Sequence, residues 1–265
     1  MGSQEPTSAL RLAGVGFTRD KQPILCDVDW EVACDQRWVV LGANGSGKTS
    51  LLRIAALYEH PTTGTVEVLG ERLGQVDVRQ LRHRVGFVSP ALAQMLRPHL
   101  KAVDVVMTAR HGALEPWWHD YTDADRERAL RLLDQVGAGG LGDRTIATLS
   151  SGERQRVQIA RSLMTDPGLV LLDEPASTLD LGGREMLVTD LARLAADSSA
   201  PPLVMVTHRT EEIPAGFTHG LMLREGRVLA LGPLEDVLTS ESLSACFGLS
   251  LELEHHNGRW HAQTR

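Results

Sequence analysis

An α/β fold around a largely parallel sheet is the fold class that this 265-residue sequence predicts. Segments with strand periodicity alternate with segments of helix periodicity along most of the chain, which favours parallel strands joined by helices. The run LVLL at 169–172 has no polar residue, as is typical of a strand buried on both faces of a parallel sheet. A second strand-like segment, RWVVL at 37–41, leads into a glycine-rich loop and then a helical pattern.

The first part of the chain differs and predicts an antiparallel layer. The segments 11–20 (RLAGVGFTRD) and 24–32 (ILCDVDWEV) are both strand-like, and the second places Val28, Trp30 and Val32 on one face. We therefore expect an N-terminal antiparallel β-subdomain beside the parallel core.

Strand signals disappear from about residue 91 to about residue 164, which predicts an inserted helical subdomain. In the segment ALRLLDQVG, Leu130, Leu133 and Val136 share one helical face, and Gly137 ends the pattern as a glycine beyond a helix C-terminus does.

Two hairpins are predicted near the end of the sequence. GLMLREGRVLALG turns at Glu225-Gly226, and SLELEHHNGRWHA turns at Asn257-Gly258, a strong two-residue turn signal. We assign residues 8–250 to one α/β domain and residues 251–265 to a C-terminal β-hairpin tail.

Composition excludes several classes of protein. No apolar run approaches the ~20 residues of a membrane-spanning helix, and the N-terminus has no secretory signal, so we expect a cytoplasmic protein. Three cysteines without a CxxC spacing argue against a disulfide framework and a zinc site. The net charge of −7 makes nucleic acid an unfavoured partner.

Residues 42–49 (GANGSGKT) match the G-x-x-x-x-G-K-[ST] pattern between a strand and a helix. Glycines let backbone N–H groups close around phosphate oxygens, and the following helix presents its positive end. Lys48 would neutralise the β- and γ-phosphates, and Thr49 would offer a hydroxyl to Mg²⁺. The predicted nucleotide-binding residues are Gly42, Ala43, Asn44, Gly45, Ser46, Gly47, Lys48, Thr49 and Ser50.

Two adjacent acids, Asp173 and Glu174, end the apolar strand at 169–172. The carboxyl end of a parallel strand is where such folds bind ligands. Asp173 therefore suits the metal, through a coordinated water, and Glu174 can accept a proton from the water that attacks the γ-phosphate. The alternative, two acids capping the next turn, has little support once the phosphate loop is present.

A second helix start follows the pattern of an anion site. Ser150 as N-cap and Glu153 three residues later have capping-box spacing, which alone predicts a well-capped helix. The Ser-Ser-Gly run also offers hydroxyls and backbone donors to an anion, and the residues themselves leave both interpretations open.

The ordered motifs GANGSGKT, LSSGE, LVLLDEP, ASTLD and VTH resemble those of ATP-binding cassette (ABC) ATPases. The resemblance runs from about residue 10 to residue 233. It implies a P-loop NTPase fold, Mg²⁺-dependent hydrolysis of ATP to ADP and phosphate, and two cassettes that dimerise head to tail.

The resemblance also assigns roles to residues. Ser150, Ser151 and Gly152, with Glu153 where many members have glutamine, would contact the γ-phosphate held by the partner subunit. The segment 177–180 would cross the dimer interface. His208 would bond the γ-phosphate and position the attacking water and Glu174.

Two positions depart from the family pattern. A glutamine that touches Mg²⁺ and senses the membrane partner is replaced by Ser89 or Pro90, with Gln94 nearby, and the Ser89 hydroxyl could bond a metal-bound water. The aromatic that stacks on adenine aligns near Arg19, whose guanidinium could stack on the base, with Phe17 as a core residue.

The predicted function is that of the ATPase subunit of an ABC transporter, a homodimer driving a separate permease at the cytoplasmic face of the membrane. The alternative is a soluble ABC ATPase acting in DNA repair or on the ribosome, which the missing glutamine favours. A narrower resemblance, to molybdate-type or photorepair-type cytoplasmic cassettes, rests on DVDWEV, the serine and EIPAGFTHGLMLREGRV. Trp117 and Trp118 could belong to a docking surface or pack against the helical subdomain.

Overall fold

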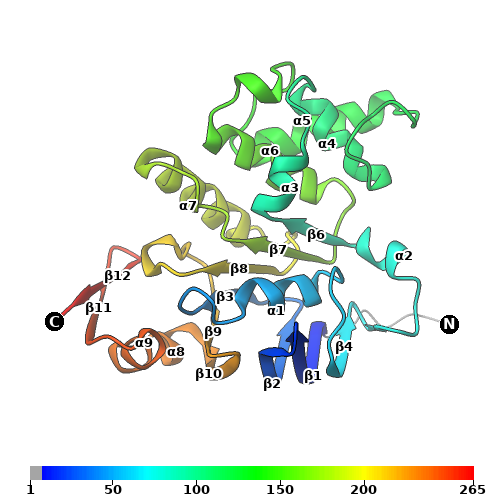
Figure 1. Cartoon of the computed structure of the whole chain (residues 1–265). Helices are drawn as coiled ribbons and strands as arrows, with labels where there is room; N and C mark the ends of the chain where they lie inside the picture. The colour runs from blue at the N-terminus through cyan, green and yellow to red at the C-terminus, as the bar shows by residue number, and fades with distance from the viewer. Residues whose placement is uncertain (1–7) are drawn as a thin grey trace.

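Two β-sheets enclose one helix in the structure, a computed structural model that describes residues 8–265. The helix is α1 (Lys48–Ala55), which follows the glycine-rich loop. Figure 1 shows it below the larger sheet and above the smaller one. Its Leu51, Leu52 and Ile54 are fully buried in a core shared by both sheets.

The larger sheet supplies the carboxyl edge on which the site is built. β9, β3, β8, β7 and β6 are mutually parallel, and β10 pairs antiparallel with β9. Its strand order is β10 (Arg227–Pro233), β9 (His219–Arg224), β3 (Arg37–Leu41), β8 (Leu203–Thr207), β7 (Leu169–Asp173) and β6 (Val85–Val88). This arrangement confirms the predicted α/β class.

The parallel strands separate two cores, because successive side chains point to opposite faces. In β7, Leu169 and Leu171 pack in the core around α1, whereas Val170 and Leu172 pack in the core under the remaining helices. All four are fully buried, as an apolar run without alternation predicts.

The smaller sheet is antiparallel along its N-terminal strands. Its order is β2 (Gln22–Ala33), β1 (Ser8–Arg19), β4 (Thr63–Val68) and β5 (Glu71–Arg72). Val28, Trp30 and Val32 face the core as predicted. The indole of Trp30 meets that of Trp38 on β3 edge-on at 5.7 Å, which ties the two sheets together.

Helices cover the opposite face of the larger sheet (Figure 1). They are α3 (Pro90–Met95), α4 (Ala102–Thr108), η1 (Ala109–His111), α5 (Asp123–Gln135), η2 (Ile146–Thr148), α6 (Ser151–Leu163) and α7 (Leu181–Ala196), with α2 (Val78–Arg82) beside the edge strand β6. Within residues 8–265, none of the helices is long and apolar enough to cross a membrane.

One expectation for these helices is wrong. The buried face of α5 runs through Ala129, Leu132, Leu133 and Val136, an i, i+3, i+4, i+7 row that leaves Leu130 41% exposed. The tryptophans after η1 are largely exposed, Trp117 at 62% and Trp118 at 85%, and the ring of Trp117 stacks on that of His99 with 5.9 Å between the ring centroids.

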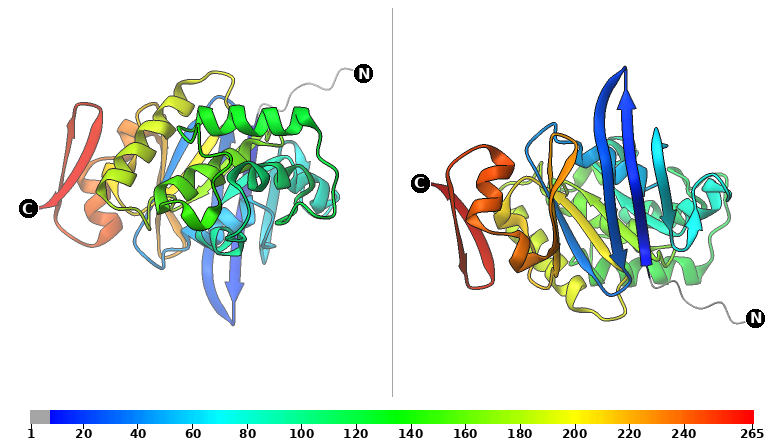
Figure 2. Two further views of the ribbon diagram at one scale, coloured as in Figure 1. Left: turned by 90° about the horizontal axis from the view of Figure 1, so that it is seen from above. Right: turned by 90° about the horizontal axis from the view of Figure 1, so that it is seen from below.

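The end of the chain forms a separate hairpin at one edge of the molecule (Figure 2). β9 and β10 are followed by α8 (Leu234–Val237), α9 (Ser240–Phe247), β11 (Leu251–His256) and β12 (Arg259–Thr264), and η3 (Thr210–Glu212) lies between β8 and β9. Asn257 and Gly258 both have positive φ, as the two-residue turn between β11 and β12 requires.

Leu52→Ala should destabilise the protein by about 2–5 kcal/mol, because it opens a cavity where α1 fills the space between the sheets. Urea unfolding followed by circular dichroism measures the change. Leu229→Ala is the matched control, since Leu229 is 42% exposed and its truncation should cost less than about 1 kcal/mol. Equal losses for the two variants would contradict the proposed packing of α1.

Candidate active site

The carboxyl ends of three neighbouring parallel strands form one edge of the larger sheet. Leu41 of β3 pairs with Thr207 of β8, and Asp173 of β7 pairs with Val206. The residues that follow these strands, Gly42, Glu174 and His208, therefore emerge side by side. The amide of Glu174 extends the ladder by donating to the carbonyl oxygen of Val206 at 3.0 Å.

Glycines shape the loop from Gly42 to Gly47. Gly45 and Gly47 have φ of 81° and 102°, a backbone conformation in which a residue with a side chain would be strained. A Cβ on Gly42 would lie 2.3 Å from the carbonyl oxygen of Leu223. The loop is also held to the turn between β9 and β10, because the amide of Gly226 donates to the carbonyl oxygen of Ser46 at 3.1 Å.

Lys48 lies at the centre of this loop and is only 4% exposed. Its Nζ donates to the carbonyl oxygens of Gly42 and Ala43 at 2.8 and 2.9 Å. Burial lowers the pKa of Lys48, and the Glu174 carboxylate opposes that shift. The ammonium is thus fixed where the loop curves. The buried Ser46 hydroxyl has no hydrogen-bond partner within residues 8–265.

Thr49 and Asp173 form a pair of oxygen donors. The Thr49 hydroxyl donates to Oδ1 of Asp173 at 3.2 Å, and Asp173 is 5% exposed. Burial raises the pKa of Asp173 to about 6. Because a buried carboxylate and a hydroxyl are hard oxygen ligands, this pair fits a Mg²⁺ ion, whose charge would also favour the ionised carboxylate.

Glu174 and His208 approach each other at the same edge. Nδ1 of His208 lies 3.5 Å from Oε1 of Glu174, and the two side chains are 30% and 27% exposed. Glu174 has a φ of 45°, a left-handed conformation that is uncommon for a residue other than glycine. Both groups keep some access to solvent, as a proton acceptor for water needs.

A cavity of about 590 Å³ extends from the two acids toward α3 and α6. Asp173 and Glu174 line it together with Ser151, Ser177 and Thr178. The lining of one cavity therefore includes Asp173 and Glu174, which are expected to act on this chain's own nucleotide, and Ser151, which is expected to contact the partner's nucleotide.

The capping box at the start of α6 is confirmed. The Ser150 hydroxyl accepts from the amide of Glu153 at 3.2 Å, and the Glu153 carboxylate accepts from the amide of Ser150 at 2.8 Å. Hydrogen bonds from Ser150 and the Arg144 guanidinium hold the pKa of Glu153 below its usual range. Ser151 and Gly152 lie in the first turn, where the helix presents unpaired N–H groups.

Ser89 is 6% exposed and caps α3, since its hydroxyl accepts from the amide of Leu92 at 3.4 Å. Pro90 occupies the first position of that helix. Gln94, one turn further, lines the same cavity as Asp173 and Glu174.

Arg19 is held by acidic and aromatic neighbours. Its guanidinium donates to Oε1 of Glu59 at 2.6 Å and lies 5.4 Å from the ring centroid of Phe17. Arg53 shares the same Glu59 oxygen at 2.7 Å. A contact between Arg19 and adenine stays a prediction, and it would have to accommodate this ion pair.

Glu212, which is 4% exposed, is a buried acid that no sequence pattern predicted. Its carboxylate accepts from the hydroxyl of Thr207, the residue before His208, at 2.5 Å. Glu211 and Glu212 resemble an exposed acidic pair in the sequence, and only the chain path shows that the second one turns inward.

Asp173→Asn should stabilise the metal-free protein above about pH 7. The pKa of Asp173 lies above its ordinary value of 3.8, so the native state binds the proton more tightly than the unfolded state does. Stability therefore falls as the pH rises from 3.8 to about 6, by up to about 3 kcal/mol. Asparagine removes this cost and still accepts from Thr49.

Thermal unfolding in EDTA at about pH 8 and about pH 4 measures the effect. The variant should unfold at a higher temperature than wild type at the higher pH, and the two should agree at the lower pH. A variant that is less stable at both values would contradict the assignment.

Comparisons with known proteins agree with this geometry. The ABC transporter family matches residues 25–177. The uncharacterized ABC transporter ATP-binding protein YlmA of Bacillus subtilis is 38% identical over 90% of each chain. The uncharacterized ABC transporter ATP-binding protein YmeB of Lactococcus lactis is 36% identical over 95% of this chain and 96% of its own.

Among solved structures, a dimeric ATP-binding cassette bound to ADP and phosphate has a TM-score of 0.72 and 25% identity, and covers 85% of this chain and 98% of its own. With the phosphate loop, the two acids and the histidine at one sheet edge, this chain belongs to the ABC transporter family, as an ATP-binding subunit.

Proposed function

We propose that this chain is a Mg²⁺-dependent ATPase that works as a head-to-tail homodimer and drives a separate membrane permease from the cytoplasmic face. The observation that carries the proposal is the convergence of Lys48, Thr49, Asp173, Glu174 and His208 on the carboxyl edge of β3, β8 and β7. The names of the relatives support transport over the alternative of a soluble repair or ribosomal ATPase.

The loop and helix α1 would bind the phosphates. Lys48 would exchange its bonds to the Gly42 and Ala43 carbonyl oxygens for phosphate oxygens, and the loop N–H groups would add donors without a change of fold. Thr49 and Asp173 would hold Mg²⁺, and Ser89 would reach it only through water. When bound, the ion would neutralise charge on the β- and γ-phosphates.

Glu174 would act as the general base. A water oxygen attacks the γ-phosphorus, the bond from that phosphorus to the β–γ bridging oxygen breaks, and Glu174 takes the water's proton. His208, 3.5 Å away, would donate a hydrogen bond to the γ-phosphate and keep the carboxylate oriented. ADP and phosphate leave, and Glu174 returns its proton to solvent.

A second copy of the chain would complete the site. Ser151 and Gly152 lie in the first turn of α6, so their backbone donors suit a phosphate brought by another protomer. The similarity to a cassette that is dimeric with ADP and phosphate supports this arrangement. Closure would bring the segment 177–180 of each protomer against the other.

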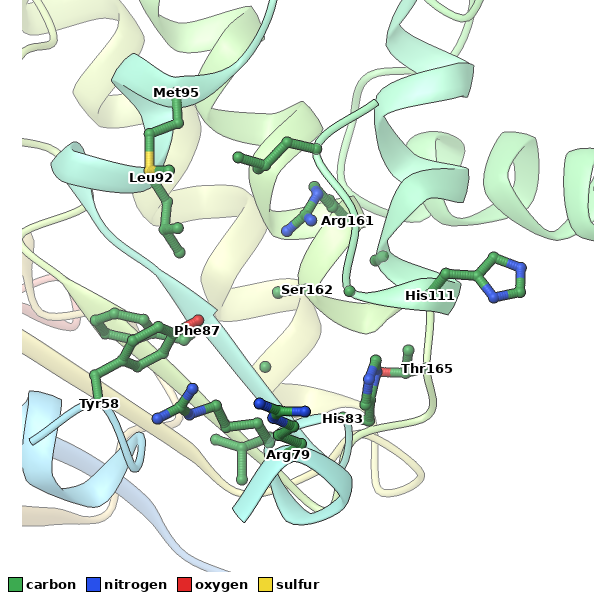
Figure 3. Close-up of a pocket in the computed structure, with 16 residues that line it drawn as sticks. Tyr58, Arg79, His83, Phe87, Leu92, Met95, His111, Arg161, Ser162 and Thr165 are labelled. Atoms are coloured by element: carbon green, nitrogen blue, oxygen red, sulfur yellow. The ribbon is translucent and has the colours of Figure 1, made fainter. Parts of the chain in front are cut away.

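The permease would dock in a cavity of about 460 Å³ between the larger sheet and the helical layer (Figure 3). Its wall combines apolar and basic side chains, and no carboxylate is among its described lining residues. Figure 3 shows Tyr58, Phe87, Leu92 and Met95 around it with Arg79, His83, His111 and Arg161. A short permease segment with apolar and acidic side chains fits this lining.

Glu174→Gln should retain ATP binding and slow hydrolysis by roughly 100-fold or more, because glutamine cannot take the proton. Light scattering with Mg-ATP should then detect a stable dimer, and detergent-solubilised membranes should yield the permease as a stoichiometric partner. Hydrolysis at the wild-type rate would remove Glu174 as the base, and recovery of ribosomal or repair proteins alone would overturn the transport function.

Arg79→Glu should weaken capture of that permease by about tenfold or more, since it places a like charge opposite an acidic segment. Pull-down in the Glu174→Gln background measures it. Arg131→Glu on α5 is the control, because Arg131 lies outside the cavity and is 69% exposed in its side chain. If both variants capture the permease as well as the parent protein does, the permease does not dock in this cavity.

A further inference from the structure

Arg259, at the start of β12, connects the C-terminal hairpin to two elements that continue from the site. Its two terminal nitrogens donate to both oxygens of Glu185 on α7, at 2.9 and 3.0 Å. Nη2 also donates to the carbonyl oxygen of Glu211 in η3 at 2.6 Å. A planar guanidinium can make these bonds at once, and it therefore joins α7 to η3.

Both elements that Arg259 joins continue directly from site loops. α7 begins after the segment 177–180, and Asp180 caps it by accepting from the amide of Gly183 at 2.7 Å. η3 begins two residues after His208. A shift of α7 against η3 would thus move the interface loop relative to the histidine.

A second, buried contact links the same two elements. The Glu212 carboxylate of η3 lies 3.7 Å from Nε of Arg184 on α7 and accepts from the Thr207 hydroxyl. That hydroxyl oxygen also accepts from the amide of Arg209 at 3.1 Å. Glu212 and Thr207 therefore hold the backbone on both sides of His208.

His208 depends on this backbone for its direction. Its Nδ1 has no hydrogen-bond partner among the described residues, although Glu174 is 3.5 Å away. The orientation of the ring toward Glu174 is consequently set by the residues that anchor the chain before and after it.

We infer that Arg259 is a positioning residue for ATP hydrolysis: by clamping α7 to η3, it fixes His208 against Glu174. The inference rests on the proposed function of Glu174 and His208. The Glu185 carboxylate and the carbonyl oxygen of Glu211 are the acceptors on the two sides of the clamp, and the hairpin β11–β12 is the element that presents Arg259. ATP binding, which uses the loop that follows β3, does not require it.

The test compares Arg259→Ala, Arg259→Lys and Glu185→Gln in the full chain. Arg259→Ala should have a kcat for ATP hydrolysis about tenfold lower than that of wild type, with a KM for ATP within about twofold of the wild-type value. Lysine, which can bond Glu185 but cannot span both acceptors, should restore part of the rate. Rates are expressed per nucleotide-binding site, titrated with ATP, so that a smaller folded fraction does not count as slower chemistry.

Hydrogen exchange supplies a readout that does not depend on activity. In Arg259→Ala the amides of residues 207–213 should lose protection, while those of the phosphate loop should not change. Arg131→Ala is the matched control, because Arg131 pairs with Glu127 at 3.8 Å on the exposed face of α5. It should leave the rate and the exchange pattern of wild type.

A wild-type kcat per site in Arg259→Ala, or unchanged exchange at 207–213, would overturn the inference. Wild-type protein and Glu174→Gln are measured in parallel to separate the two proposals. Failure of the wild-type chain to hydrolyse ATP would count against the proposed function, whereas normal hydrolysis in both wild type and Arg259→Ala would count against the clamp alone.

Discussion

The parallel pairing of β3, β8 and β7 is the constraint on which the rest of this molecule depends. It aligns the ends of three strands that are far apart in the chain, so that Gly42, Glu174 and His208 start from one line. A parallel sheet needs cover on both faces, and here the cover differs: a helix backed by a second sheet on one side, a helical layer on the other. The site lies where both covers stop.

The residues of the site fall into a buried group and a more exposed group. Lys48, Asp173 and Thr207 are nearly or fully buried and are held by hydrogen bonds to backbone or side-chain groups. Glu174 and His208 are more open, and Ser151 is at the surface of α6. An enzyme that must close on a second copy needs this combination, because the phosphate cradle has to be formed before closure and the interface has to remain accessible.

The sequence predicts those parts of the site whose chemistry is local. The glycine pattern, the acids after LVLL and the cap at Ser150 each depend on residues that are close together in the chain, and the fold class follows from periodicity alone. Contacts between distant segments left no such pattern. Glu212 needs Thr207 and Arg184, and Arg259 needs Glu185 and the Glu211 carbonyl oxygen, so neither could be found before the chain path was known. The prediction that Leu130 is buried was wrong for a smaller reason: the buried face of α5 passes through Ala129, one residue earlier.

The distribution of indoles has a practical consequence. Trp30 and Trp38 are buried, at 2% and 3% exposed. Trp117 and Trp118 are exposed to solvent, on the segment that follows His111 and Leu114, which line the cavity of Figure 3. Trp260, the fifth tryptophan, is half-buried in the C-terminal hairpin, where its ring stacks on that of His255. The emission spectrum therefore combines buried, half-buried and exposed indoles, and the exposed pair responds to whatever covers that segment. Selective quenching by a water-soluble agent such as acrylamide separates them, so the unlabelled protein carries an optical reporter of partner association.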